Sequence, residues 1–156
     1  MFILLDIDGV LVTEPVWKKV ESEADGFMRF NPDAAKNLSD ILIKTGATVV
    51  LTSSHRINYP DHEWPDIFKR RGIEVTSFTK VNEAASITDL KDRTQEIMDW
   101  VARNNHIDNF VIIDDHAAIL ECPVVVKSRW VVTNLFKGID DDVKQKVLLI
   151  LSNDNR

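Results

Sequence analysis

The sequence is short of cysteine, of long apolar runs and of positive charge. Cys122 is the only cysteine among 156 residues, so no intrachain disulfide can form and a reducing compartment is expected. The longest apolar stretches span a handful of residues, far fewer than the ~20 that a membrane-spanning helix needs. A net charge of −6 argues against a broad electrostatic surface for nucleic acid and leaves room only for a local basic patch. We therefore expect a cytoplasmic protein that does not enter a membrane.

The length and composition fit one globular domain. With 44% apolar and 28% charged residues, a chain of 156 residues can bury a full hydrophobic core and has little left for a second one. The apolar run at residues 2–7 is better explained by a strand than by a signal peptide, because it lacks a basic flank and sufficient length. We expect a single domain over residues 1–156.

Strand and helix patterns alternate along the chain. Apolar runs predict buried strands at residues 2–7, 47–52, 73–78 and 109–115, with a fifth strand from either 123–127 or 129–133. Periodicity and helix-start signals predict helices over residues 32–45, 65–71 and 89–104, and a last helix after residue 140. This alternation predicts a three-layer α/β/α, Rossmann-like domain with a mainly parallel five-stranded sheet.

The first predicted strand runs directly into Asp6 and Asp8, which Gly9 follows at once. Carboxylates beside a core are costly to bury unless something compensates their charge. A calcium-binding EF-hand loop does not fit, because Val10 stands at its third ligand position and no helix precedes it. Acids in a turn after a strand are the alternative interpretation, but the pattern favours a compensating cation.

Two further predicted strands also end in polar side chains. Thr52 and Ser53 follow the second strand, and Asp114 and Asp115 end the fourth. Ligands of such sheets bind beyond the carboxyl ends of the strands, where these side chains and Asp6 should meet. Mg²⁺ commonly takes one or two carboxylates together with phosphate oxygens and water. Together these residues predict a site for magnesium and phosphate. Taken alone, the hydroxyl of Thr52 would indicate only the end of a strand, and the pair Asp114 and Asp115 only a solvated loop.

These motifs resemble those of the haloacid dehalogenase (HAD) superfamily, whose members are mostly Mg²⁺-dependent phosphatases. The stretches that carry the resemblance are "DIDGVLV", "VVLTSS" and "VIIDD". The stretches "TSSHR" and "RTQEIMDWV" and the tail "VVTNLFKGIDDDVKQKVL" resemble a small branch without a cap domain, the HAD domains of "Swiss army knife" RNA repair proteins. Two positions depart from that branch, since His55 replaces its usual Trp and Thr94 replaces a Gly.

The resemblance implies a role for each of these residues. Asp6 would be the nucleophile that forms an aspartyl-phosphate, and Asp8 would protonate the leaving oxygen and then activate water. Asp6, Asp114 and the backbone carbonyl of Asp8 would hold Mg²⁺, with Asp115 orienting the metal site. Thr52 would donate a hydrogen bond to a phosphoryl oxygen.

The third motif of the superfamily, a cation before a helix, is matched by both Lys91 and Arg93. Either residue could equally be an ordinary surface residue of a helix, and the spacing of Arg93 to Trp100 favours it slightly within the closer family. At the mouth of the second strand, Ser53 and Arg56 are candidates for contacts with substrate. The four histidines are scattered and are not expected to bind a metal.

The spacing leaves no room for an inserted cap domain. Between Asp8 and Thr52, a helix and a strand fill most of the second half, and residues 13–30 remain as a loop or flap. An open site would admit phosphorylated small molecules such as nucleotides, or nucleic-acid ends. The resemblance to RNA repair proteins favours such ends, whereas the acidic net charge disfavours them.

The expected function is therefore a Mg²⁺-dependent phosphomonoester hydrolase. A phospho-accepting receiver domain is an alternative, but it carries its acidic pair on the first strand, whereas here the pair lies on the fourth. A non-catalytic HAD-like module is another, although every candidate position holds a competent residue. Phosphonate or carbon–halogen chemistry is disfavoured, because Asp8 supplies the acid that a leaving oxygen needs.

Overall fold

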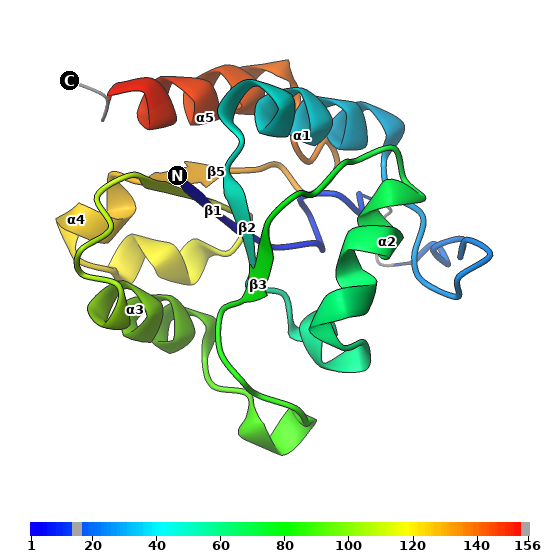
Figure 1. Ribbon diagram of the computed structural model, residues 1–156, viewed down its shortest axis with the longest axis horizontal. Helices are drawn as coiled ribbons and strands as arrows, with labels where there is room; N and C mark the ends of the chain where they lie inside the picture. The colour runs from blue at the N-terminus through cyan, green and yellow to red at the C-terminus, as the bar shows by residue number, and fades with distance from the viewer. Residues whose placement is uncertain (14–16, 154–156) are drawn as a thin grey trace.

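The chain folds around one parallel sheet of five strands (Figure 1). The computed structural model describes residues 1–13 and 17–153. The strands are β1 (Phe2–Leu5), β2 (Thr48–Leu51), β3 (Phe78–Lys80), β4 (Phe110–Asp114) and β5 (Trp130–Val132). The α-helices are α1 (Pro32–Thr45), α2 (Trp64–Lys69), α3 (Arg93–Arg103), α4 (Val124–Lys127) and α5 (Asp141–Asn153). None of the described helices combines the length and apolar character needed to cross a bilayer.

The strand order β3-β2-β1-β4-β5 places β1 at the centre of the sheet, between β2 and β4. Leu5 pairs with Leu51 on one side and with Ile113 on the other, so these three strands end level with one another. Since all the pairings are parallel, residues that follow the three strands meet at one edge of the sheet. The order of the strands therefore gathers the polar residues of the sequence into one place.

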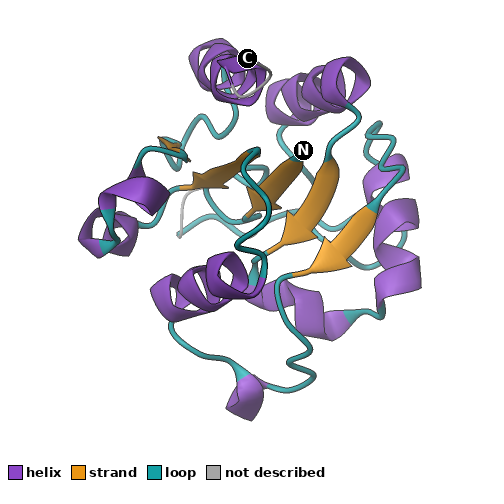
Figure 2. Cartoon of the chain, turned by 60° about the vertical axis from the view of Figure 1, so that its left-hand side comes forward, coloured by secondary structure: helices purple, strands orange, loops and turns teal. Residues whose placement is uncertain are grey.

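Helices cover both faces of the sheet, as burial of a parallel sheet requires (Figure 2). Alternate strand residues such as Ile3 and Leu5 pack with the apolar sides of α1, α2 and α5. The intervening Leu4 packs with Ile97 and Trp100 of α3 on the opposite face. Over the described residues the structure thus has the expected three-layer α/β/α architecture, with no inserted cap domain.

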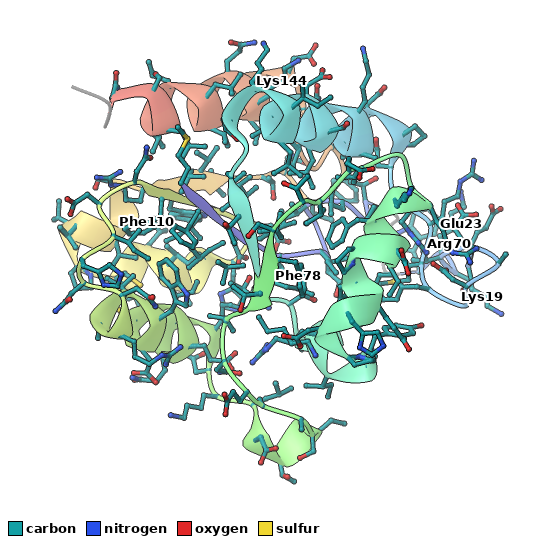
Figure 3. The ribbon with its side chains drawn as sticks, in the orientation of Figure 1. Lys19, Glu23, Arg70, Phe78, Phe110 and Lys144 are labelled. Carbon is teal, nitrogen blue, oxygen red and sulfur yellow. The ribbon has the colours of Figure 1, made fainter. Side chains whose placement is uncertain are left out.

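Side chains fill both layers around the sheet (Figure 3). Phe78 at the start of the edge strand β3 stacks on Trp64 of α2, with ring centroids 6.4 Å apart. On the other face Phe110 lies 5.8 Å from Trp100 of α3. Lys144 joins α5 to α1 through an ion pair with Asp40 at 3.0 Å.

The sequence predicted the order of the elements, but three boundaries differ. Strand β3 begins at Phe78 rather than at residue 73, because residues 73–77 form a loop whose apolar side chains Ile73 and Val75 are buried without strand pairing. Residues 123–127 contribute the short helix α4, so the fifth strand comes from the other candidate stretch. Helix α3 begins at Arg93, since residues 87–89 form a separate 3₁₀ turn closed by Ser86.

The segment predicted as a flap, residues 13–30, is fixed to the body of the protein over its described part, residue 13 and residues 17–30. Residues 14–16 lie outside the described residues. The guanidinium of Arg71, which follows α2, donates two hydrogen bonds to the Asp25 carboxylate, at 2.7 and 2.9 Å. It also lies 5.4 Å from the centroid of the Phe27 ring and 5.0 Å from that of Phe30. Figure 3 shows Glu23 of this segment near Arg70 at the end of α2. This segment is anchored through a buried guanidinium.

The Arg71–Asp25 pair should stabilise the fold in a pH-dependent way. The hydrogen bonds from Arg71, opposed by burial, lower the pKa of Asp25 from 3.8 to about 2. Since the pKa in the folded state is the lower one, the stabilisation is complete above pH 4 and is lost as the pH falls through 2. We expect Asp25→Asn to lower the free energy of unfolding by about 1–3 kcal/mol at pH 7 and to cost progressively less toward pH 2.

Urea unfolding at several pH values measures this difference. Glu21→Gln is the matched control, because Glu21 pairs with Arg29 in the same segment at 3.0 Å but is 75% exposed. It should change stability by less than about 0.5 kcal/mol. Equal effects of the two substitutions would contradict the anchoring role of Asp25.

Candidate active site

Three carboxylates meet at the carboxyl ends of the central strands. Asp6 follows β1, Asp114 ends β4 and Asp115 comes directly after it. One oxygen of each lies within 4.8 Å of the others. Asp6 and Asp114 are almost fully buried, and Asp115 is partly so. The sheet therefore brings together three of the four aspartates that the sequence predicted as metal ligands.

Arg93, the first residue of α3, pairs with two of these carboxylates. Its Nη1 lies 2.6 Å from Oδ2 of Asp114 and 3.2 Å from Oδ2 of Asp6. Although burial lowers the pKa of Arg93, the two carboxylates raise it above its usual range, so the guanidinium stays charged. Among the described residues Arg93 is the one cation paired with the three carboxylates, so the group keeps an excess of negative charge.

Two of these carboxyls, those of Asp6 and Asp115, have a raised pKa. Burial has the largest effect on Asp6 and raises its pKa to about 7. The positive charge of Arg93 opposes this rise, and the negative charge of Asp114 adds to it. Burial and then Asp114 also raise the pKa of Asp115. A hard divalent cation takes carboxylate oxygens as ligands and would favour their ionised forms. The donor set and its charge thus fit a metal ion.

The loop after β1 is shaped to let Asp115 approach. Gly9 has φ of +75°, and a Cβ at this position would lie 2.1 Å from Oδ2 of Asp115. The hydroxyl of Thr133 donates a hydrogen bond of 2.7 Å to the carbonyl of Gly9 and holds the loop in place. Glycine is therefore required here both for the backbone conformation and for space.

The side chain of Asp8 stands apart from the three grouped carboxylates. It is 62% exposed, and its Oδ2 lies 2.9 Å from Nε2 of His55. This hydrogen bond raises the pKa of His55 despite the opposing effect of burial. His55 is not part of the group of three carboxylates. Its imidazole instead contacts Asp8, the residue that the sequence predicted as the general acid.

The two residues after β2 differ in what their hydroxyls do. Oγ1 of Thr52 is buried and has no hydrogen-bond partner within the described residues, although its backbone N–H bonds to Leu5 at 2.9 Å. Oγ of Ser53 accepts the backbone N–H of His55 at 3.2 Å and so caps the 3₁₀ helix η1 (Ser54–Asn58). The Thr52 hydroxyl is thus left available to a ligand, whereas that of Ser53 is used within the fold.

Arg56 does not reach the surface of the site. Its side chain is completely buried, and its Nη1 donates to the carbonyls of Thr52 and Ser53 at 3.0 and 3.1 Å. Its Nη2 donates to Asn82 at 2.9 Å and to the carboxylate of Glu96. The contact with substrate that the sequence predicted is disfavoured, because the guanidinium is turned inward. Arg56 instead fixes the end of β2.

The structure also separates the two candidates for the third motif. Lys91 is 61% exposed and pairs with Asp99 at 3.4 Å. Arg93, in contrast, pairs with Asp6 and Asp114 of the site. Sequence reasoning assigned no role to Glu96, to His55 or to Thr133. Glu96 follows Arg93 by three residues in the stretch "RTQEIMDWV". An acid on the same side of the helix as Arg93 was the sequence signal that could have identified it.

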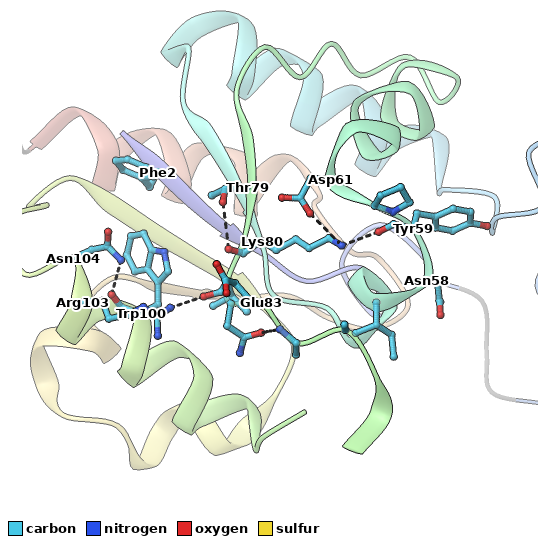
Figure 4. A pocket seen from close by; sticks show the side chains of 16 residues that line it. Phe2, Asn58, Tyr59, Asp61, Thr79, Lys80, Glu83, Trp100, Arg103 and Asn104 are labelled. Carbon is cyan, nitrogen blue, oxygen red and sulfur yellow. Dashed lines mark hydrogen bonds and ion pairs between the residues drawn. The ribbon is translucent and has the colours of Figure 1, made fainter. Parts of the chain in front are cut away.

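A separate groove is lined by residues outside this site (Figure 4). It measures about 700 Å³ and runs between β3, the segment after η1 and α3, and none of the predicted site residues lines it. Lys80 crosses it to the carbonyl of Tyr59 at 2.7 Å and to Asp61 at 3.3 Å. Asn82 lines the groove and also binds Arg56, so one side chain links it to the end of β2.

Comparison with known proteins gives one family. A family model described as the HAD domain in Swiss Army Knife RNA repair proteins matches residues 2–143. No curated protein and no solved structure matches significantly. The matched span includes all five strands and every residue of the carboxylate group. The chain therefore belongs to the family of HAD domains found in Swiss Army Knife RNA repair proteins.

Proposed function

We propose that this protein is a Mg²⁺-dependent phosphomonoester hydrolase that works through an aspartyl-phosphate. The proposal is carried by one observation: three clustered carboxylates, the partly buried Arg93 and a threonine hydroxyl without a partner in the described residues lie at the ends of three neighbouring strands. Carboxylates suit the metal, and the arginine and the hydroxyl suit phosphoryl oxygens. Membership of a HAD family supports the same chemistry.

Asp6 and Asp114 would hold the Mg²⁺ ion, with Asp115 beside them and the backbone carbonyl of Asp8 as a further oxygen ligand. The bound ion would reduce the repulsion between a carboxylate nucleophile and a phosphate and would stabilise the charge that develops on the phosphoryl oxygens. Arg93 is fixed on two of these carboxylates and holds positive charge beside the nucleophile. It would favour the ionised form of Asp6, which burial disfavours.

In the first step a carboxylate oxygen of Asp6 attacks the phosphorus, and the bond from phosphorus to the leaving oxygen breaks. Asp8 gives its proton to that leaving oxygen. In the second step Asp8 takes a proton from water, the resulting hydroxide attacks phosphorus, and the bond to Asp6 breaks to release phosphate. The hydroxyl of Thr52 would donate to a phosphoryl oxygen in both steps.

The substrate we propose is a phosphorylated nucleotide or the phosphorylated end of a polynucleotide. Among the described residues between β1 and α1 there is no cap domain, which would let a large substrate reach the carboxylates. The occurrence of this family of HAD domains in RNA repair proteins supports a nucleic-acid end. A net charge of −6 means that binding would depend on the local charge of Arg93 and the metal. We place this activity in the cytoplasm.

Phosphate release from an aryl phosphate tests the proposal. With Mg²⁺ present the wild-type protein should turn over, and EDTA should abolish the activity. Asp6→Asn should lower kcat at least ~10³-fold, because the amide cannot form the phosphoenzyme. Lys91→Gln is the matched control, since Lys91 is exposed and pairs with Asp99 rather than with a carboxylate of the site. Metal-independent turnover, or equal turnover by Asp6→Asn, would contradict the proposal.

The role of the Thr52 hydroxyl can be tested separately. Since Oγ1 has no partner in the described residues, Thr52→Val should not lower the free energy of unfolding, because no hydrogen bond is lost and a buried, unsatisfied hydroxyl is removed. The same substitution should lower kcat by about 10²-fold, because a donor to the phosphoryl oxygens is lost. Thr52→Ser keeps the hydroxyl and should retain most of the activity. A Thr52→Val protein with wild-type kcat would show that the hydroxyl does not contact substrate.

A further inference from the structure

His55 forms a contact that the proposed chemistry does not yet use. It lies in η1, directly beyond the end of β2, and its Nε2 is 2.9 Å from Oδ2 of Asp8. The two residues are 47 positions apart in the sequence. Within the described chain, His55 supplies the only hydrogen bond to the side chain of Asp8.

Without this contact the Asp8 carboxylate would be poorly fixed. Its side chain is 62% exposed, and an exposed carboxylate with no partner changes rotamer freely. Proton transfer to a leaving oxygen requires the acid within hydrogen-bond reach and in a defined direction. A donor on Oδ2 restrains the carboxyl group and leaves Oδ1 as the oxygen that can face a substrate.

The imidazole is itself held on two sides. The backbone N–H of His55 donates to Oγ of Ser53 at 3.2 Å, which ties the residue to the end of β2. The ring of Phe27 packs against the imidazole edge to face, with centroids 5.5 Å apart and the planes at 80°. Phe27 is 4% exposed and is covered by the guanidinium of Arg71 at 5.4 Å. A rigid chain of contacts therefore runs from the anchored segment through His55 to Asp8.

We propose that His55 is a positioning residue that fixes the carboxyl group of Asp8 for proton transfer to and from the substrate. The inference rests on the proposed function, because it gives Asp8 the role of general acid and base. The neutral tautomer with hydrogen on Nε2 is sufficient for the contact. Ser53 and Phe27 act through His55, because their contacts fix the position and orientation of its imidazole ring.

The test uses aryl phosphates whose leaving groups differ in acidity, at one pH and with saturating Mg²⁺. 2,4-Dinitrophenol leaves without needing a proton, whereas phenol needs one. His55→Phe keeps an aromatic ring against Phe27 but has no donor for Asp8. We expect kcat/KM for phenyl phosphate to fall ~10-fold or more, and that for 2,4-dinitrophenyl phosphate to change less than ~3-fold.

Two further variants separate positioning from a structural effect. The side-chain amide of His55→Gln can donate to Asp8, so this protein should recover at least part of the phenyl phosphate activity. His62→Phe is the matched control, because His62 is an exposed histidine in the neighbouring turn, and it should behave as the wild type. Asp8→Asn should show the same dependence on the leaving group as His55→Phe, with a larger loss.

The outcomes distinguish this inference from the proposed function. An equal fall for both substrates, no change for either, or no recovery in His55→Gln would overturn the positioning role while the phosphatase stands. A rise for phenyl phosphate in His55→Phe would also overturn it, since the contact would then hold Asp8 back. Absence of wild-type turnover on both substrates would instead overturn the proposed function, and the inference with it.

Discussion

The burial of two carboxylates at the end of a parallel sheet is the constraint to which the rest of this structure responds. Asp6 and Asp114 lose most of their solvent, and the only described cation on them is the guanidinium of Arg93. Burial raises the pKa of Asp6 to about 7, since Arg93 only partly offsets the loss of solvent and the charge of Asp114 adds to the rise. The three carboxylates at this edge of the sheet are therefore compatible with a bound cation.

Helix α3 organises the site from one side. Arg93 in its first turn reaches the aspartates, and Glu96, three residues later, binds the buried Arg56. Residues at this spacing lie on the same side of a helix, so one helix face holds both the carboxylate group and the end of β2. Breaking a buried pair leaves an uncompensated charge and typically costs about 3–5 kcal/mol. The position of Thr52 therefore depends on the buried pair of Arg56 and Glu96.

The sequence was sufficient to predict that polar side chains gather at the ends of the central strands. It was insufficient to predict the buried contacts that hold those strand ends in place. Each strand that carries Asp6, Thr52 or Asp114 is an apolar run ending in a polar residue, and a parallel sheet brings such ends together whatever its other details. The position of β3 was wrong because burial of Ile73 in a loop leaves the same pattern as a strand. The inward turn of Arg56 and its pairing with Glu96 depend on tertiary contacts 40 positions apart, which no local pattern encodes.

The most direct measurement of the central claim is the capture of beryllofluoride on Asp6, because this anion copies an acyl phosphate when it binds a carboxylate. Fluorine NMR would follow the wild-type protein and Asp6→Asn, each with Mg²⁺ and with EDTA. We expect signals of bound fluoride in the wild type with Mg²⁺, and none with EDTA or in Asp6→Asn. No bound signal in the wild type, or the same signal in Asp6→Asn, would contradict the assignment of Asp6 as the phosphate-accepting residue.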